Sequence, residues 1–341
     1  MTTAVPRTAR EVRLAVVPSG LPGPEHFTVA ETPLTPPGAG RVLVRNQYFS
    51  VFPALRTLFG TEIEDTPLPG LRSGDALFGP AVGEVVAAPA DSPLRPGDQV
   101  VHLLGWRDYA LVEAAHCTPV DPALPDPVAH LGLGSVAYGA LTRLAPVREG
   151  DTVLVTGAAG AVGSVAGQIA RLLGAGRVIG STGSPAKAER LKSELGYDAV
   201  VLRGAGSFAG RLAEAAPDGI DVLLDLVAGE QLTAAVDAAR PGARFALAGT
   251  LSAQLSPHQA GDRAPVEIDA FRVVVRGISL RGYSGADHPE VEREWTGRFG
   301  AWLRAGDIRF PHVRIAGLDR APEALRDVIA GRWFGAVIVE L

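Results

Sequence analysis

The segment VLVTGAAGAVGSVAGQIARLLG (153–174) constrains the fold more than any other part of the chain. An apolar strand is predicted to end near residue 157, and a helix is predicted over 161–173. Between them, Ala158, Gly160 and Gly163 fit the pattern Gly/Ala-x-Gly-x-x-Gly. Such a turn lets the backbone approach a pyrophosphate and lets helix and strand pack closely, and the helix N-terminus favours phosphate. The pattern predicts a dinucleotide site over 158–163, which includes Ala159, Ala161 and Val162. An empty turn kept for its shape is the alternative.

The residues around this turn alternate between predicted strands and helices. Nearly continuous apolar runs occur at 152–157, 177–182, 199–203, 219–227 and 243–249, and 278–284 could add a sixth strand. Buried parallel strands have this character, and repeated β-α-β units give a doubly wound sheet. The first ~125 residues instead show short strands separated by Pro and Gly, which is typical of a barrel or sandwich. The chain is therefore predicted to be an α/β protein of two parts.

The end of the second predicted strand indicates which dinucleotide is bound. An NAD site usually has Asp or Glu there, ~20 residues after the glycines. This chain has Ser181 and Gly183, and no acid before Glu189. Lys187 lies close behind and could pair with a 2′-phosphate, and Arg203 could add a second cation. These residues predict NADPH as the cofactor, and the alternative for Lys187 is a solvated surface residue.

Composition excludes several classes of function. The net charge is −5, so a nucleic-acid partner is not expected. Cys117 is the only cysteine, which excludes an intrachain disulfide and cysteine-rich zinc sites and suits a reducing cytoplasm. We expect no metal site, because no histidine has a neighbouring ligand at metal spacing. No signal peptide is recognised, no membrane segment is expected, and the predicted location is cytoplasmic.

Motifs of other enzyme classes are missing from the sequence. It contains no GxxxxGK(S/T) and no GxSxG. The positions four residues before the two lysines are Gly183 and Ala188, so the Tyr-x-x-x-Lys of short-chain dehydrogenases is absent. A zinc alcohol dehydrogenase would need more cysteines than this chain has.

Nearly the whole chain resembles one family, the zinc-independent medium-chain dehydrogenase/reductases. The similarity is to the branch of leukotriene B4 dehydrogenases, prostaglandin reductases and NADPH-dependent alkenal reductases. It is carried by RLAVVPSGLPGPEHFTVAETPLTPPGAGRVLVRNQYFSV (13–51), GWRDYALV (105–112), AYGAL (137–141), GAAGAVGSVAGQIARLLG (157–174), GSPAKAERLKSELGYDA (183–199) and APEALRDVIAG (321–331). The resemblance implies a GroES-like β-barrel catalytic domain over 1–127 and 303–341, and a Rossmann domain over 128–302. Lys187 matches the family's 2′-phosphate lysine, and Arg203 stands where the family usually has a tyrosine.

Residue roles at the cofactor and substrate are expected on the same ground. The remaining expected cofactor contacts are Val227, Gly249 and Thr250. Hydrogen-bond donors or acids near the reacting atoms would be Tyr48, Arg56, Tyr283 and His288. The substrate pocket would be lined by Ser50, Phe52, Ala54, Tyr109, Trp333 and Phe334. Some of these residues have simpler interpretations: Tyr48 could be core, Arg56 an anchor for a short helix, Tyr109 barrel packing and His288 a solvated loop residue.

The sequence departs from the family at the expected active site. The family's SVDPYMR is here SVFPALR (50–56), so Phe52 replaces an acid and Ala54 an aromatic residue. DNVGGE is here DLVAGE (225–230), Val136 replaces the Thr of TAY, and His288 aligns with a tyrosine. These changes predict an apolar pocket for a bulky unsaturated substrate.

Three functions follow as hypotheses. The first is an NADPH-dependent reductase that transfers hydride to a conjugated C=C bond, in bacterial secondary metabolism. The second is a reductive cyclase that acts on a polyene or polyketide-derived intermediate, in which hydride addition triggers C–C bond formation. The third is a non-catalytic NADPH-binding protein. A homodimer is compatible with all three.

Overall fold

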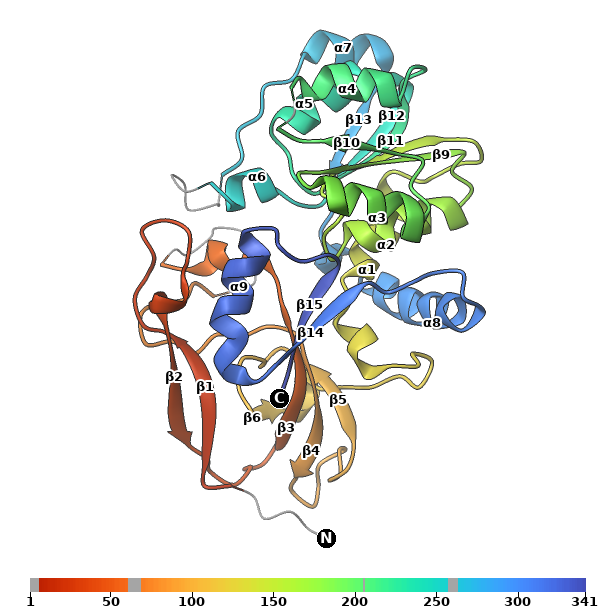
Figure 1. Cartoon of the computed structure of the whole chain (residues 1–341). Coiled ribbons are helices and arrows are strands. Elements are labelled where there is room, and N and C mark those ends of the chain that lie inside the picture. The colour runs from red at the N-terminus through yellow and green to blue at the C-terminus, as the bar shows by residue number, and fades with distance from the viewer. Residues whose placement is uncertain (1–5, 61–68, 205, 257–262) are drawn as a thin grey trace. The chain divides into compact units, whose positions relative to one another are not determined.

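The computed structural model describes residues 6–60, 69–204, 206–256 and 263–341 (Figure 1). The chain divides into two compact units. The first unit comprises 1–131, 313–333 and 337–341, and the second comprises 132–312 and 334–336. The domain limits expected from the sequence, 128 and 303, stay a prediction.

A six-stranded parallel sheet forms the centre of the second unit. Its spatial order is β10-β9-β8-β11-β12-β13, so the strand order reverses between β8 and β11. The strands are β8 (Thr152–Val155), β9 (Arg177–Thr182), β10 (Ala199–Leu202), β11 (Ile220–Asp225), β12 (Ala239–Leu247) and β13 (Ser279–Gly282). All five neighbouring pairs are parallel. The predicted doubly wound sheet is confirmed, including its sixth strand.

Helices surround this sheet in two groups (Figure 1). α2 (Gly163–Leu172) packs on α3 (Pro185–Leu195), whereas α5 (Glu230–Asp237) contacts both α4 (Phe208–Ala215) and α7 (Ala270–Arg276). The short α6 (Leu251–Gln254) follows β12. Strands and helices share a core that includes Leu154, Ile179, Leu223 and Phe245, all of which are fully buried. Burial of these apolar side chains is the main force that holds the sheet to its helices.

Two further helices of the second unit pack through aromatic rings. α1 (Gly134–Gly139), which continues into a π-helical turn over 140–144, lies against α8 (Pro289–Ala305). A Cβ on Gly134 would stand 2.1 Å from Trp295 Cζ2, so only glycine permits this approach. Tyr138 of α1 packs against Trp295 of α8, with 5.9 Å between ring centroids.

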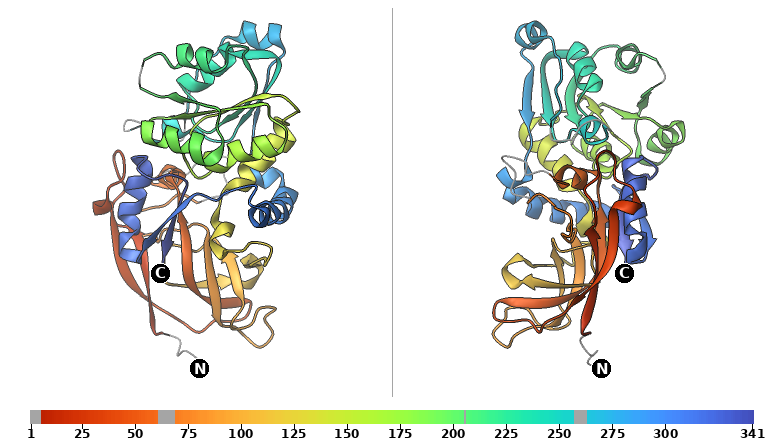
Figure 2. Two further views of the ribbon diagram at one scale, coloured as in Figure 1. Left: turned by 45° about the vertical axis from the view of Figure 1, so that its right-hand side comes forward. Right: turned by 90° about the vertical axis from the view of Figure 1, so that its left-hand side faces the viewer.

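Most strand pairs of the first unit are antiparallel. Its larger sheet has the order β14-β15-β3-β4-β5-β7, and β6 also pairs with β3. These strands are β14 (His312–Ala316), β15 (Ala336–Glu340), β3 (Arg41–Val51), β4 (Ala81–Ala87), β5 (Gln99–His102), β7 (Thr118–Pro119) and β6 (Tyr109–Glu113). Helix α9 (Ala321–Ile329) contacts β3. Figure 2 shows the C-terminal strand β15 beside β3, as their pairing requires.

A two-stranded ribbon, β1 (Thr8–Leu14) with β2 (Phe27–Pro33), completes the described strands of this unit. Isolated bridges, such as Glu11 to Arg107, link β1 to the rest of the unit. The α/β class with two architectures is confirmed. The expected barrel takes the form of an open sheet with a separate ribbon, because the described edge strands β14 and β7 do not pair with each other.

Candidate functional site

The glycine-rich turn connects β8 to α2 in the second unit. A Cβ on Gly163 would lie 2.5 Å from Ala158 Cα, so this glycine is needed for helix and strand to meet. A Cβ on Gly160 would meet only the Gly157 carbonyl oxygen, at 3.4 Å, which leaves space beside its backbone. The two glycines therefore have the separate roles that the sequence predicts, one for packing and one for ligand approach. Ala158 and Ala159 are buried, whereas Ala161 and Val162 are partly exposed.

The predicted phosphate-binding cations gather at the end of β9. Ser184 caps α3 by accepting a hydrogen bond from the Lys187 backbone N–H. The Lys187 side chain is about half buried, and this burial, with Arg190 nearby, lowers its pKa. The Arg203 guanidinium lies over Gly183, with Nη2 3.2 Å from the position that a Cβ would take. Lys187 thus lies in the first turn of α3, which follows β9, and Arg203 lies in the loop that follows β10.

Ser181, which was predicted to contact the cofactor, is instead buried and hydrogen-bonded to other residues of the protein. Its side chain is 1% exposed, accepts a hydrogen bond from the Gly157 N–H at 3.0 Å and donates one to Gln231 Oε1 at 2.5 Å. The hydroxyl therefore holds the glycine-rich turn in place, and its own proton is directed at Gln231.

The remaining predicted cofactor contacts meet beside the same turn. Val227 Cγ2 would lie 3.2 Å from a Cβ on Gly157, and a Cβ on Gly249 would lie 2.9 Å from the Leu226 carbonyl oxygen. Thr250 precedes α6, whose Ser252 N–H donates to the Val227 carbonyl. The loops after β8, β11 and β12 therefore lie together at the carboxyl ends of these strands, where doubly wound sheets bind ligands.

Sequence reasoning missed two buried polar residues at this edge. Thr156 and Asp225 are both fully buried, and the Thr156 hydroxyl donates to Asp225 Oδ1 at 2.6 Å. The sequence contains a signal for both residues. Thr156 and Asp225 are polar residues at the ends of the apolar segments TVLVT (152–156) and VLLD (222–225).

Tyr283 and His288, two predicted catalytic residues, are brought together after β13. Their rings stack with 5.6 Å between centroids and 6° between planes. A Cβ on Gly139 of α1 would stand 2.0 Å from the Tyr283 hydroxyl. Partial burial, followed by the charges of Glu292 and Glu290, raises the pKa of Tyr283. His288 Nδ1 lies 3.6 Å from Glu290 Oε1.

Two other predicted catalytic residues belong to the first unit. Tyr48, on β3, has the Arg314 guanidinium 5.4 Å from its ring centroid. Arg56 lies in the short helix 53–58, is only 5% exposed, and has Nη2 3.4 Å from the Gly20 carbonyl oxygen. Burial lowers the pKa of Arg56. Its position matches the alternative interpretation of an anchor for this helix.

The predicted pocket residues of the first unit lie on β3, on β6 and around the same short helix. Ser50 is buried on β3, Tyr109 begins β6, and the Ala54 carbonyl accepts a hydrogen bond from Thr57 Oγ1 at 2.7 Å. Phe52 precedes the helix. A Cβ on Gly79 would lie 3.3 Å from Phe52 Cε1 and 3.5 Å from Trp106 Nε1. Trp106, which was not predicted as a site residue, is thus a close neighbour of the predicted pocket.

Phe334 and Trp333 complete the set of predicted pocket residues. Phe334 is 5% exposed, and its ring lies under the Arg190 guanidinium, 4.0 Å from the ring centroid. The Arg190 side chain therefore covers this ring, which the prediction placed in a substrate pocket. Trp333 directly precedes it and is partly exposed.

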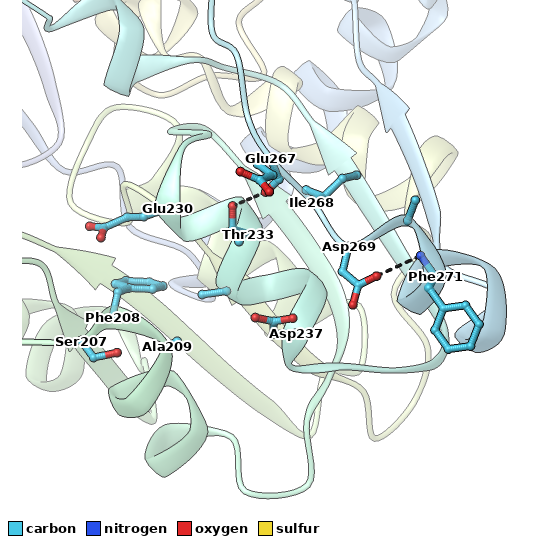
Figure 3. Close-up of a pocket in the computed structure, with 12 residues that line it drawn as sticks. Ser207, Phe208, Ala209, Glu230, Thr233, Asp237, Glu267, Ile268, Asp269 and Phe271 are labelled. Carbon is cyan, nitrogen blue, oxygen red and sulfur yellow. Dashed lines mark hydrogen bonds between the residues drawn. The ribbon is translucent and has the colours of Figure 1, made fainter.

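A hollow of about 890 Å³ occurs elsewhere on the second unit, between α4, α5 and residues 267–271 (Figure 3). Its lining includes the acidic side chains Glu230, Asp237, Glu267 and Asp269. Carboxylates there would repel phosphates, and no predicted site residue lines it. Among the described residues we find no cluster of ligands fit to hold a metal ion. In the same residues, no helix combines the length and apolarity needed to cross a membrane.

Comparison with known proteins agrees with this geometry. The family described as the N-terminal domain of oxidoreductase matches 10–120, and the one described as zinc-binding dehydrogenase matches 161–298. A putative NADP-dependent oxidoreductase of Bacillus subtilis is 31% identical over 97% of both chains. The NADPH-dependent curcumin reductase of Escherichia coli is 30% identical over 96% of this chain and 95% of its own.

Solved structures show the same relationship. CurA from Vibrio vulnificus superposes with a TM-score of 0.87 at 28% identity, and covers 97% of this chain and 98% of its own. The same protein has been solved in complex with NADPH. The chain belongs to the medium-chain dehydrogenase/reductases, in the zinc-independent branch that contains the NADP-dependent curcumin, prostaglandin and alkenal reductases.

Proposed function

We propose that the protein is an NADPH-dependent reductase that saturates a polarised C=C bond in a bulky apolar substrate. One observation carries the proposal: the turn at Gly160 is open to a pyrophosphate, and the adjoining end of β9 has Lys187 and Arg203 but no carboxylate. An NAD site would place an acid at that strand end. A relative matched over 96% of the chain is named as an NADPH-dependent curcumin reductase, and one matched over 89% as an NADP(+)-dependent 2-alkenal reductase, which supports the same conclusion.

The residues present fit this cofactor. The turn at 158–163 would hold the pyrophosphate, Lys187 and Arg203 the 2′-phosphate, and Val227, Gly249 and Thr250 the other half of the molecule. When bound, NADPH supplies the hydride. The substrate accepts it at the electron-poor carbon of the C=C bond, and the resulting enolate then takes a proton at its other carbon.

The protein's own groups would stabilise that enolate and provide its proton. Hydrogen-bond donors aimed at the developing oxyanion contribute most to such a reaction. Tyr48, Tyr109 and Arg56 are the candidates in the first unit, and Arg56 also has Nη2 3.4 Å from the Gly20 carbonyl oxygen. We assign the proton to the stacked Tyr283–His288 pair, because the two rings lie 5.6 Å apart and both side chains can act as general acids.

Cofactor titration tests this function first. Wild-type protein should bind NADPH more tightly than NADH, and Lys187→Ala should weaken NADPH by roughly 10–100-fold, because a charged hydrogen bond contributes about 1.5–3 kcal/mol. NADH binding should hardly change. Equal wild-type affinities for the two cofactors in a calorimetric titration would contradict the proposal.

A reductive cyclase and a non-catalytic binding protein are the competing functions. Phe52 and Ala54, which replace polar and aromatic family residues, motivate both. Deuterium from labelled NADPH should appear on a former sp² carbon of the product. A ring formed in the same product, detected by mass spectrometry and NMR, would identify a cyclase. Tight NADPH binding without transfer of label to any conjugated acceptor would leave only the binding protein.

We also propose a cytoplasmic homodimer active in bacterial secondary metabolism. Three side chains of α7 are strongly exposed although apolar: Phe271, Val274 and Val275. β13, the next strand, stands at the edge of its sheet. A second copy that paired along this edge would cover both features. Light scattering should give twice the monomer mass, and Val274→Glu should shift it to the monomer.

A further inference from the structure

Asp225 accepts hydrogen bonds from three groups and is itself fully buried. Oδ1 takes the Thr156 hydroxyl at 2.6 Å, the Val227 N–H at 3.0 Å and the Ala228 N–H at 3.0 Å, and Oδ2 lies 3.1 Å from the same Ala228 N–H. Thr156 Oγ1 in turn accepts the Leu226 N–H at 2.8 Å. A buried carboxylate requires such partners, since an unpaired one would be very costly.

These bonds lie where the strand order of the sheet reverses. Thr156 directly follows β8 and Asp225 ends β11, the two strands on either side of the reversal. Doubly wound sheets bind dinucleotides in the crevice outside the carboxyl ends of the strands at this point. The hydroxyl–carboxylate bond therefore ties together the two edges of the predicted cofactor crevice.

The same carboxylate shapes the loop after β11. Ala228 has φ +62°, a left-handed conformation that costs an alanine about 1–2 kcal/mol. Both hydrogen bonds to its N–H hold it there, and Gly229 follows with φ +59°. The loop thus presents a fixed backbone beside Gly157, with Val227 Cγ2 3.2 Å from the place of a Gly157 Cβ.

We propose that Asp225 and Thr156 are positioning residues for the nicotinamide half of the dinucleotide. β8, β9 and β10 form the mononucleotide half that holds the adenosine phosphates, and β11 begins the second half. The hydrogen bonds of Asp225 then set the width of the crevice and fix the backbone of the loop on which the nicotinamide ribose rests. This inference rests on the proposed use of NADPH.

A matched control is present on the same two strands. Asp221 lies near the start of β11 and accepts the Thr152 N–H at 2.9 Å, at the opposite ends of β8 and β11. Its carboxylate also pairs with Arg240. It ties the same strands with the same chemistry but lies away from the crevice. If Asp225 only held β8 and β11 together, replacing Asp225 or Asp221 would change ligand affinity by the same amount.

The experiment compares a full cofactor with half of it. Calorimetry is run on wild type, Asp225→Asn, Thr156→Val, Thr156→Ser and Asp221→Asn, with NADPH and with adenosine 2′,5′-bisphosphate, which lacks the nicotinamide half. We expect Asp225→Asn and Thr156→Val to weaken NADPH about tenfold or more and the bisphosphate less than twofold. Thr156→Ser, which keeps the hydroxyl, should restore NADPH binding, and Asp221→Asn should change neither ligand.

The outcomes separate this inference from the proposed function. Equal losses for both ligands, or unchanged NADPH affinity in Asp225→Asn and Thr156→Val, would overturn the positioning role. Wild-type protein that binds neither ligand would overturn the proposed function itself. If Asp225→Asn does not fold, the comparison of Thr156→Val with Thr156→Ser decides the question alone.

Discussion

Ala228 and Trp106 are the only non-glycine residues with positive φ among the described residues, and each unit contains one of them. At Ala228 the unusual backbone is held by hydrogen bonds, through the buried carboxylate of Asp225. At Trp106 it is held by packing, because the indole is fully buried against Phe49 with 5.2 Å between ring centroids. Ala228 and Trp106 therefore have the same backbone conformation for different physical reasons.

The difference indicates where each unit has changed. Around Ala228 the buried polar atoms of Asp225 and Thr156 are paired. Trp106 Nε1, by contrast, has no hydrogen-bond partner among the described residues, and Phe52 is its neighbour across Gly79. The resembling reductases carry an acid in place of Phe52. The departures from the resembling family therefore occur in both units: Phe52 and Ala54 lie in the first, whereas Val136, the 225–230 loop and His288 lie in the second.

The largest expected effect on stability comes from removing the buried indole of Trp106. Trp106→Ala should lower the free energy of unfolding by about 3–5 kcal/mol, since it empties a fully buried indole site. Trp106→Phe should cost clearly less, because it keeps a ring and removes an N–H that lacks an acceptor. Urea unfolding of both variants measures the difference. Equal costs would mean that packing is not what holds the backbone at Trp106.

A pH-dependent loss of stability of similar size is expected from the hydrogen bonds of Asn46 and His102, which lie beside Trp106. Asn46 Nδ2 donates to the Leu104 and Arg107 carbonyls, and its Oδ1 accepts from His102 Nε2 at 2.9 Å. His102 Nδ1 accepts the Leu104 N–H at 3.0 Å, so the ring is neutral with its proton on Nε2. Burial, followed by the charge of Arg107, lowers the pKa of His102 from 6.5 to about 4.

The sign follows from that lowered pKa. The unfolded state takes up a proton below pH 6.5, and the folded state does so only near pH 4. Stability should therefore be complete above pH 6.5, fall by up to about 3 kcal/mol as the pH drops towards 4, and level off below it. Urea unfolding of His102→Gln, which cannot titrate, should lack this component. A wild-type slope identical to that of His102→Gln would disprove it.

In the second unit, the glycine-rich turn allows fold and ligand binding to be separated. Gly160→Ala should leave the thermal midpoint of the ligand-free protein almost unchanged, since its Cβ meets only one atom, at 3.4 Å. NADPH affinity should fall at least about tenfold, because the methyl group occupies the space of the pyrophosphate. Gly163→Ala, with a Cβ 2.5 Å from backbone atoms, should instead destabilise the protein without ligand. Thermal unfolding with and without NADPH distinguishes the two.

The smallest expected effect is a gain in stability. Ala228→Gly relieves the left-handed strain but makes the unfolded chain more flexible, so the net gain should be about 0.5–1 kcal/mol. Differential scanning calorimetry can measure such a shift. A loss of stability would mean that the Ala228 methyl group contributes packing that outweighs the strain.

The sequence predicts the second unit well because its signals are local. An apolar strand, a small-residue turn and a helix follow one another within 153–174, and the parallel sheet follows from the repetition of such units. The contacts of Asp225 with Thr156 join residues 69 positions apart, so local spacing could not reveal them. The roles of Ser181 and Phe334 depend on Gln231 and Arg190, which the pattern of either segment does not indicate. The open form of the first sheet depends on the pairing of its edge strands, which composition and turn signals do not determine.

The position of β15 beside β3 has a consequence for synthesis on the ribosome. β3 and its partners β4 and β6 have been synthesised by residue 113, but β15 begins only at residue 336. At about 5–20 residues per second, the interval is roughly 10–45 s. During that time one edge of β3 lacks a partner over Tyr48–Val51, because β6 pairs on that edge only with Arg41–Arg45. The strands β8 to β13 of the second unit are completed in the same interval. The nascent first unit must therefore be protected from edge-to-edge association until the last residues of the chain emerge.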